Sequence, residues 1–222
     1  MINTINNKVF KNANEAYEYL HDAIIQHGVD FAGTKALFNV GFYITDPLDN
    51  NITNEERNWK HKYAWSEWQW YLSGDPNIKK LGEIYGKVPA IWKRMADGQG
   101  NVNSNYGYQW QRGYGHKSQL DYVIKLLKDN PETRQAAISI YDCKEHLDYK
   151  TDTPCTYAVQ FTILHSKLDM CVTMRSNDLW YGFCNDQYCF SKLQEMVSNE
   201  LNIEPGTYYH FAHNMHLYND KI

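Results

Sequence analysis

Apolar residues recur at helical spacing in four parts of the chain. The stripe from Ala16 to Ile24 is preceded by asparagines and followed by Gly28. Such a stripe between a capping residue and a glycine is typical of an amphipathic helix. The motif Ser118-x-x-Asp121 resembles a capping box, which marks the start of another helix. We predict helices over residues 12–28, 54–72, 118–130 and 186–201.

Short apolar segments indicate strands between and after these helices. Residues 29–47 alternate short apolar runs with glycines, which suggests a loop that leads into a strand. Three strand candidates follow one another closely and a fourth lies near the C-terminus: AAISIY, YAVQFTIL, LDMCVTM and TYYHFA. Helices mixed with clustered strands predict an α+β fold in which helices pack on one sheet. No linker divides the chain, so we expect a single domain over residues 1–222.

Composition and charge narrow the class of protein. Acidic residues outnumber basic ones by 26 to 22, and the net charge of −4 argues against general binding to nucleic acid. No apolar run approaches the roughly 18 residues of a membrane span. The five cysteines are an odd number, and the N-terminus lacks the apolar core of a signal peptide. We therefore expect a reduced, cytoplasmic protein that has no membrane or direct nucleic-acid partner.

Cys155 is the candidate nucleophile, although a cysteine after a proline is more often an inert packed thiol. Arg175 and Asp178 are charges within a stretch that otherwise has the pattern of a strand and a turn. Burying such charges is costly unless they are paired or serve a ligand. A nearby arginine would also favour the thiolate form of the cysteine.

Six segments resemble, in their order and approximate spacing, the thymidylate synthase superfamily: SEWQWYLSGDPNI, NSNYGYQW, NPETRQAAISIY, PCTYAVQF, MRSNDLWYGFCND and HLY. The resemblance covers nearly the whole chain, from about residue 30 to the C-terminus. It implies helices packed on one large mixed β-sheet that forms the interface of a homodimer. It also implies an enzyme that binds a pyrimidine nucleoside monophosphate and 5,10-methylenetetrahydrofolate, without a metal.

In the reaction that this resemblance implies, the Cys155 thiolate adds to C6 of the pyrimidine. The ring then becomes enamine-like, so C5 can attack the one-carbon unit of the folate. After C5 loses its proton, an exocyclic methylene remains. Hydride transfer from the folate converts this methylene to a methyl group, whereas attack by water gives a hydroxymethyl group.

Within the superfamily, the chain resembles the bacteriophage deoxycytidylate hydroxymethylases more than the thymidylate synthases. Thr156 follows the nucleophile where the synthases usually carry histidine, and Asp186 stands where they carry the asparagine that reads uracil. A carboxylate accepts from N4 of cytosine and, once protonated, can also donate to N3. We therefore expect hydroxymethylation of dCMP or CMP. Asn185 lies immediately before Asp186, and a register shift of one residue would restore a uracil reader.

Further residues match positions that surround the nucleotide and the folate in the superfamily. Glu67 matches the glutamate that organises water and proton transfers, and its aromatic neighbours predict a raised pKa. The alternative for Glu67 is a solvated charge on a helix face. Trp92 matches a ring beside the folate. The resemblance implies Cys155, Glu67, Asp178 and Tyr106 as catalytic residues, and Trp92, Asp178 and Glu67 as folate-binding residues.

The resemblance also assigns the residues that hold the phosphate and the sugar. Arg175 and Ser176 match one part of the phosphate site. Arg134 matches an arginine that reaches across a two-fold axis into the pocket of the partner subunit. The implied substrate-binding residues are Asp186, Asn185, Arg175, Ser176, Arg134 and Lys35, together with His216 and Tyr218 at the sugar 3′-hydroxyl.

The chain departs from the pattern of the superfamily at three further places. Gln135 replaces the second of two adjacent arginines, and Phe31 replaces a cationic loop residue for which Lys35 could compensate. The chain stops four residues after Tyr218, where the superfamily continues with a segment that helps to exclude water. If the protein naturally ends there, a wetter site would favour hydroxymethylation over hydride transfer, whereas a truncated chain would lose activity.

Alternative functions stay open at this point. A thymidylate synthase or a C5-methylase acting on dUMP or dCMP would use the same nucleophile. A binding module could stack its aromatic rings on single-stranded nucleic acid, although such proteins also need a positive groove. His210, His213 and His216 could be taken for a metal cluster. A spacing of three residues alternates faces in a strand, so we do not expect zinc there.

Overall fold

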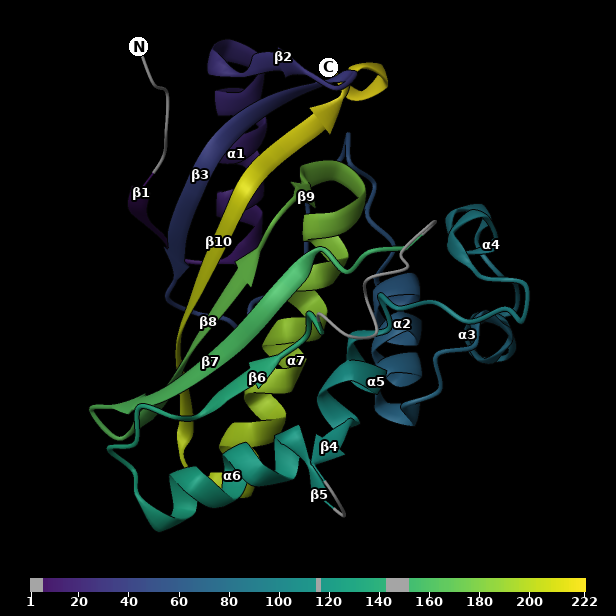
Figure 1. The fold of residues 1–222 in the computed structure, drawn as a ribbon. Coiled ribbons are helices and arrows are strands. Elements are labelled where there is room, and N and C mark those ends of the chain that lie inside the picture. Colours follow the sequence, from purple (N-terminus) through teal and green to yellow (C-terminus); the bar gives the residue numbers. More distant parts are fainter. Residues whose placement is uncertain (1–5, 115–116, 143–151) are drawn as a thin grey trace.

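The structure, a computed structural model, describes residues 6–114, 117–142 and 152–222. Its centre is an eight-stranded mixed sheet in the order β1-β3-β10-β8-β7-β6, with β2 beside β3 and β9 beside β10 (Figure 1). The long strand β10 runs antiparallel to β3 and parallel to β8 and β9. The strands of this sheet are β1 (Asn6–Phe10), β2 (Val29–Phe31), β3 (Thr34–Ile44), β6 (Ala137–Ser139), β7 (Thr156–Leu164), β8 (Lys167–Met174), β9 (Asn177–Asp178) and β10 (Glu204–Tyr218). A separate two-stranded ribbon joins β4 (Gly113–Tyr114) to β5 (Lys117–Ser118).

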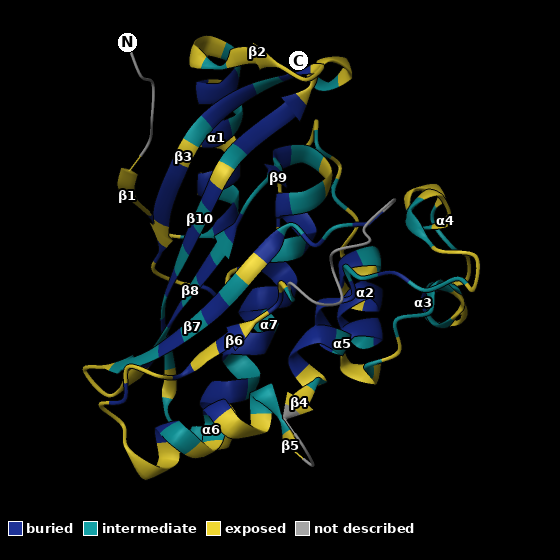
Figure 2. Ribbon diagram, viewed as in Figure 1, coloured by how far each residue is buried: buried dark blue, intermediate teal, exposed yellow. Residues whose placement is uncertain are grey.

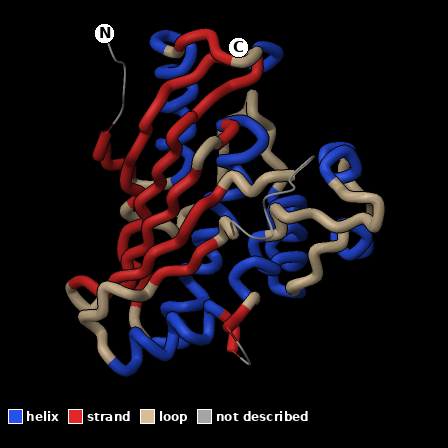
Figure 3. Tube along the Cα trace, in the orientation of Figure 1, coloured by secondary structure: helices blue, strands red, loops and turns tan. Residues whose placement is uncertain are grey.

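The helices lie mainly on one side of the sheet (Figure 3). α1 and α7 lie behind the sheet in the view of Figure 1, and α2 to α5 form a group beside α7. The helices are α1 (Ala13–His27), α2 (His61–Ser73), α3 (Ile78–Tyr85), α4 (Ala90–Met95), α5 (Tyr106–Gln111), α6 (Gln119–Asp129) and α7 (Cys184–Leu201), with a π-helical turn at Leu179–Phe183 and a 3₁₀ turn at Asn219–Lys221. This arrangement confirms the predicted α+β fold with helices packed on one large mixed sheet.

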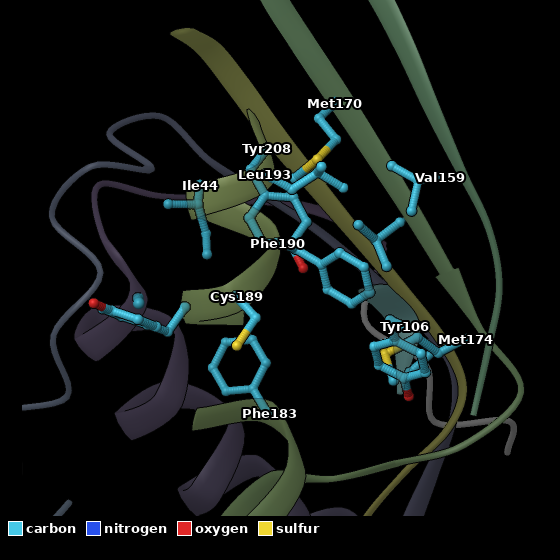
Figure 4. Close-up of a cluster of buried hydrophobic side chains, with 14 of the residues drawn as sticks. Ile44, Tyr106, Val159, Met170, Met174, Phe183, Cys189, Phe190, Leu193 and Tyr208 are labelled. Atoms are coloured by element: carbon cyan, nitrogen blue, oxygen red, sulfur yellow. The ribbon is translucent and has the colours of Figure 1, made fainter. Parts of the chain in front are cut away.

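The core forms where the sheet meets these helices. β8 buries every second residue, Leu168, Met170, Val172 and Met174, while the residues between them stay partly exposed (Figure 2). This period of two places one face of the strand against α7. Phe190 and Leu193 of α7 face the strands in the same apolar cluster as Met170 and Met174 (Figure 4).

Two predicted helices begin where their capping residues indicate. The side chain of Asn12 accepts a hydrogen bond of 2.9 Å from the Glu15 amide at the start of α1. Ser118 and Asp121 form the reciprocal bonds of a capping box at the start of α6, as the motif predicts. These side-chain acceptors satisfy backbone amides that have no partner within the helix.

The predicted helix over residues 54–72 was wrong at its beginning, because α2 starts only at His61. The side chain of Asn54 accepts from the Arg57 amide, and Asn58 has a positive φ of 45°, so the segment before α2 forms turns. The final strand is longer than TYYHFA and covers residues 204–218. The pattern also missed the short helices α3, α4 and α5.

β10 contains all three histidines that could suggest a metal cluster. His210 and His216 are buried, whereas His213 is exposed on the opposite face. Within the described ranges, no group of three potential metal ligands converges on one point. None of the helices in the described part of the chain combines the length and the apolar character that crossing a membrane requires.

Candidate active site

A cavity of about 640 Å³ opens between the helices and the sheet, beside the start of β7 and the C-terminal ends of β8 and β10. This volume is typical of a site for a small organic ligand. Glu67 and Tyr63 come from α2, Trp92 from α4, Asp186 from α7, and Cys155 from the residue before β7. The predicted site residues that line the cavity are Cys155, Glu67, Asp178, Tyr106, Asp186, Asn185, Arg175, Tyr218 and Trp92.

Arg175 holds the backbone of the segment that carries Cys155. Its Nη2 donates to the Thr153 carbonyl at 2.6 Å and its Nε donates to the Pro154 carbonyl at 3.0 Å. The backbone amide of Arg175 donates to the Cys155 carbonyl at 2.8 Å. One arginine therefore contacts three consecutive carbonyls beside the thiol, and only part of its guanidinium is left to bind an anionic ligand.

Asp152 anchors the start of the same segment. Its carboxylate is buried and accepts two hydrogen bonds from Ser104, one from Oγ at 2.5 Å and one from the backbone amide at 2.7 Å. Burial raises the pKa of Asp152, and the bonds from Ser104 act in the opposite direction. Both residues line the cavity, so an acidic group lies close to the candidate nucleophile.

The thiol of Cys155 is not activated in the free protein. Burial raises its pKa to about 11, because the surrounding protein disfavours the charged thiolate. The positive charge of Arg175 lowers this pKa, as the sequence suggested, but its effect is the smaller one. The predicted direction of the arginine's effect is confirmed, and burial outweighs it.

Glu67 is buried within α2 and belongs to a chain of hydrogen bonds. Burial, followed by the charge of Asp186, raises the pKa of Glu67 to about 8. The predicted rise in pKa is confirmed, and the alternative of a solvated helix-face charge is wrong. The hydroxyl of Tyr63 donates to Glu67 Oε1 at 3.0 Å, and the indole of Trp92 donates to the Tyr63 hydroxyl at 2.8 Å.

Asp186 lies in the first turn of α7 and faces the cavity. The side-chain amide of Asn177 donates to its Oδ2 at 2.8 Å. Burial raises the pKa of Asp186 to about 7, while the bond from Asn177 lowers it. A carboxyl group with this pKa is present in both protonation states near neutral pH. It can therefore accept one hydrogen bond and donate another.

Asn185 also lines the cavity, but protein groups occupy its side-chain amide. Its Oδ1 accepts from the indole of Trp59 at 2.9 Å, and its Nδ2 donates to the Tyr181 carbonyl at 2.8 Å. These two bonds fix the orientation of the amide, so a base that bound to it would have to share both atoms with protein partners. Between the two neighbouring candidates for the base reader, the geometry favours Asp186.

Asp178 forms the first residue of the turn that leads into α7. Its Oδ1 accepts from the Trp180 amide at 2.9 Å. Burial raises the pKa of Asp178 to about 6, against the effect of this hydrogen bond and of the nearby Arg57 charge. Asp178 thus has a structural partner and also exposes acidic oxygen atoms to the cavity.

Four predicted site residues do not line the cavity of the described chain. Lys35 lies in β3 opposite Leu217, and Arg134 is exposed in the connection before β6. Ser176 directly follows Arg175 but does not reach the cavity, and His216 bonds to the side chain of Asn214 at 2.8 Å. The roles assigned to these residues stay predictions.

The sequence analysis did not single out four further residues that line the cavity: Tyr63, Asn177, Asp152 and Ser104. Tyr63 precedes Glu67 by four residues, and this spacing places two side chains on the same face of a helix. That spacing was a usable signal. Asn177 and Asp186 come from β9 and α7, and Asp152 and Ser104 lie far apart in the sequence, so no local pattern pairs them.

Comparison with known proteins identifies the family. The sequence model described as thymidylate synthase matches residues 15–222, so the chain belongs to the thymidylate synthase family. Members of this family are one-carbon transferases that act at C5 of a pyrimidine nucleotide. The family uses methylenetetrahydrofolate as a co-substrate, and the aromatic rings that line the cavity suit such a planar ligand.

The relatives include thymidylate synthases and deoxycytidylate 5-hydroxymethyltransferases. A thymidylate synthase of Fusobacterium nucleatum is 36% identical over 70% of this chain and 56% of its own length. The deoxycytidylate 5-hydroxymethyltransferase of Enterobacteria phage T4 is 32% identical over 81% of this chain and 71% of its own length. The fold resembles thermostable thymidylate synthase A from Bacillus subtilis, with a TM-score of 0.74 and 23% identity over 93% of this chain and 80% of that one.

Proposed function

We propose that this protein is a folate-dependent hydroxymethyltransferase that converts dCMP, or CMP, to the 5-hydroxymethyl nucleotide. The observation that carries the proposal is the pair of Asp186 and Asn177 in the cavity. Asn177 uses one lone pair of Oδ2 and leaves Oδ1 for a ligand. The protonated carboxyl group can donate to N3 of cytosine and accept from its N4 amino group.

Uracil would fit the ionised form of this carboxyl group poorly, whereas the N4 amino group of cytosine can donate to it. The O4 and N3–H of uracil present an acceptor and a donor, so an ionised Asp186 would place a carboxylate oxygen against O4. A buried mismatch of this kind leaves polar groups without partners, which rejects the wrong ligand by large factors. The occupied side chain of Asn185 supports the same choice of base.

The other cavity residues suit the steps of such a reaction. The sulfur of Cys155 forms a bond to C6 and loses its proton, while the carboxyl group of Asp186 stabilises the negative charge that develops toward N3. C5 then bonds to the one-carbon unit of the folate and loses its proton to a base in the cavity. Cleavage of the bond between this carbon and the folate nitrogen releases tetrahydrofolate and leaves the exocyclic methylene, and after water has added to it the Cys155 sulfur leaves C6 as the free thiol. Glu67, whose pKa of about 8 suits proton transfer near neutral pH, positions the water that adds to the exocyclic methylene.

The decisive experiment compares four substrates in one assay. The purified protein is incubated with methylenetetrahydrofolate and C5-tritiated dCMP, CMP, dUMP or UMP, and tritium release, the nucleotide product and dihydrofolate are measured. We expect tritium release from a cytidylate, a 5-hydroxymethyl product and no dihydrofolate. Turnover of dUMP with both cytidylates inert would overturn the assignment of Asp186 as a reader of cytosine.

A thymidylate synthase is the second candidate function. The 36% identity to the Fusobacterium nucleatum enzyme favours it, because that relative carries this name. The two functions differ in the fate of the methylene. Stoichiometric formation of dihydrofolate with a 5-methyl product would identify reductive transfer and exclude the hydroxymethyltransferase.

We also propose that the protein acts as a homodimer through the face of the sheet opposite α1 and α7. Tyr43 and Tyr157 are exposed on this sheet, at 36% and 42% of their surface. Arg134 is exposed in the same chain and would complete the partner's pocket. Mixing inactive Arg134→Ala and Cys155→Ser proteins should restore about a quarter of the sites, since mixed dimers contain one complete pocket. No recovery after subunit exchange would contradict shared sites.

A further inference from the structure

The hydroxyl of Tyr63 connects two elements that line the cavity. It accepts a hydrogen bond from Trp92 Nε1 of α4 and donates to Glu67 Oε1 of α2. An indole nitrogen can only donate, so the direction of the first bond is fixed. The Tyr63 hydroxyl in turn donates its single proton to Glu67 Oε1 at 3.0 Å. Burial also raises the pKa of Tyr63 well above its ordinary value, which keeps this donor protonated.

We propose that Tyr63 is a positioning residue that fixes the Glu67 carboxyl group and links it to Trp92. The proposal deepens the hydroxymethyltransferase function and rests on it for its effect on turnover. The sequence pattern assigned no role to this tyrosine. Tyr63 belongs to the candidate active site, because Tyr63, Glu67 and Trp92 all line the same cavity.

The bond from Tyr63 makes the two oxygens of Glu67 unequal. Oε1 receives the tyrosine proton, and within the described residues Oε2 has no hydrogen-bond partner. A proton taken up by Glu67 therefore belongs on Oε2, which is left to exchange it with water or substrate in the cavity. Without the tyrosine hydroxyl, the carboxyl group could rotate and present either oxygen.

The same hydroxyl couples Glu67 to the α4 side of the cavity. α4 has six residues, and Trp92 packs edge-on against Trp70 at 5.2 Å between ring centres. The indole of Trp92 donates to Tyr63, so a movement of this ring on ligand binding would reach Glu67 through a single hydroxyl group. Residues at this side of the cavity can thereby influence the proton on Glu67 without touching it.

Packing alone does not explain the hydroxyl group. The Tyr63 ring contacts Tyr85 edge-on at 5.2 Å between ring centres, and a phenylalanine would keep this contact. Tyr85 does not line the cavity. The pair therefore offers matched substitutions, because Tyr63→Phe and Tyr85→Phe each remove one hydroxyl from the same aromatic contact, and only the first breaks the link between Trp92 and Glu67.

The test uses two readouts that do not depend on turnover. Infrared titration of the protonated carboxyl band, assigned by its loss in Glu67→Gln, gives the midpoint for Glu67. The indole N–H signal, assigned by its loss in Trp92→Phe, reports the bond from Trp92. In Tyr63→Phe we expect a higher midpoint, because the lost hydrogen bond favoured the ionised carboxylate, and faster exchange of the Trp92 indole proton. The other indole signals check the fold.

Kinetics then measure the effect on the proposed reaction. We expect kcat for the cytidylate to fall by about tenfold or more in Tyr63→Phe, with the basic limb of its pH profile moved upward and little change in KM. Tyr85→Phe should match the wild type in all three measurements. An unchanged Glu67 midpoint and Trp92 signal in Tyr63→Phe, or equal shifts in both variants, would overturn the positioning role. A wild-type protein that turns over neither cytidylate would instead refute the proposed function and leave the spectroscopic result to decide on Tyr63.

Discussion

Asp186 is the residue on which the choice of base depends in the proposed reaction. Its carboxyl group faces the cavity with one oxygen held by Asn177. In Asp186→Asn, the new amide can donate to O4 of uracil and accept from its N3–H. We expect the ratio of kcat/KM for cytidylate over uridylate to fall by roughly 100-fold or more, because the amide pairs with uracil and no longer with cytosine. Tritium release from both labelled nucleotides measures this ratio.

Asp178→Asn is a matched control for that substitution. It also replaces a carboxyl group of the cavity by an amide. The Asp178 side chain, however, accepts a hydrogen bond from the Trp180 amide and not from the side chain of Asn177. This variant should lose activity on both nucleotides and keep their ratio. If Asp178→Asn changed the ratio as strongly as Asp186→Asn, the preference would come from the total charge of the cavity, and the assignment of Asp186 would fail.

The ionisation of the Cys155 thiol can be tested by its rate of alkylation. With a pKa of about 11, the thiol is almost fully protonated near neutral pH in the free protein. We expect iodoacetamide to modify Cys155 about tenfold more slowly than glutathione in the same solution at pH 7.5, because the thiolate is the reacting form. Peptide mapping by mass spectrometry separates Cys155 from the other cysteines.

The pH dependence of this alkylation makes the test sharper. The rate at Cys155 should still increase above pH 10, where an exposed thiol has reached its plateau. A plateau near pH 8 would show that Arg175 outweighs burial, contrary to the structure.

The site residues that stand in recognisable sequence motifs could be predicted from the sequence. The hydrogen-bond partners that orient these residues could not. Cys155, Glu67 and Asp186 stand in recognisable segments, and all three line one cavity. The burial of Glu67 also follows from its aromatic neighbours. Asn177 was missed because its partner lies nine residues away, beyond a π-helical turn that no local pattern indicated.

At the scale of the secondary-structure elements, the capping box of α6 offers a test of stability. Ser118 Oγ accepts from the Asp121 amide at 3.0 Å, at the first turn of the helix. Ser118→Ala should lower the free energy of unfolding by about 1 kcal/mol, because this amide loses its acceptor. Urea denaturation measures the change. Ser118→Thr keeps the hydroxyl acceptor and should retain most of the stability; equal loss in both variants would exclude the cap as the cause.

Elements were predicted well where a cap or a regular period marks them. α1 and α6 have side-chain caps, and β7 and β8 alternate buried and exposed residues. α2 begins later than predicted because turns before it satisfy their own backbone groups. α4 has only six residues and no side-chain cap, so its position depends on packing around the cavity, which the sequence pattern does not reveal.

At the scale of the whole molecule, the cavity concentrates acidic groups. In the described residues, Glu67, Asp152, Asp178 and Asp186 line it together with two arginines. Burial is the first cause of the raised pKa of each of these carboxyl groups. The fold therefore places acids where ionisation is costly, which is common in active sites. The free energy of unfolding should therefore depend on pH.

We predict that the free energy of unfolding decreases as the pH rises from about 4 to about 8. In the unfolded chain these carboxyl groups ionise near pH 4, whereas Asp178, Asp186 and Glu67 keep their protons in the native state up to about pH 6, 7 and 8. The buried His210, whose pKa is lowered to about 3, and His216 act in the opposite direction below about pH 6.5, but the carboxyl groups of the cavity outnumber them. The native state therefore binds more protons, so rising pH favours unfolding. Urea denaturation across this range measures the slope.

Glu67→Gln isolates the largest contribution to this slope. The amide keeps an acceptor oxygen for Tyr63 but cannot ionise, so the variant should lose less stability than the wild type between pH 5 and pH 8, by a few kcal/mol at most. Glu18→Gln removes an exposed carboxylate of α1 and should leave the slope unchanged. If Glu67→Gln followed the wild-type curve, Glu67 would already be ionised at neutral pH. The proposed exchange of its proton with water at the methylene would then lose its physical basis.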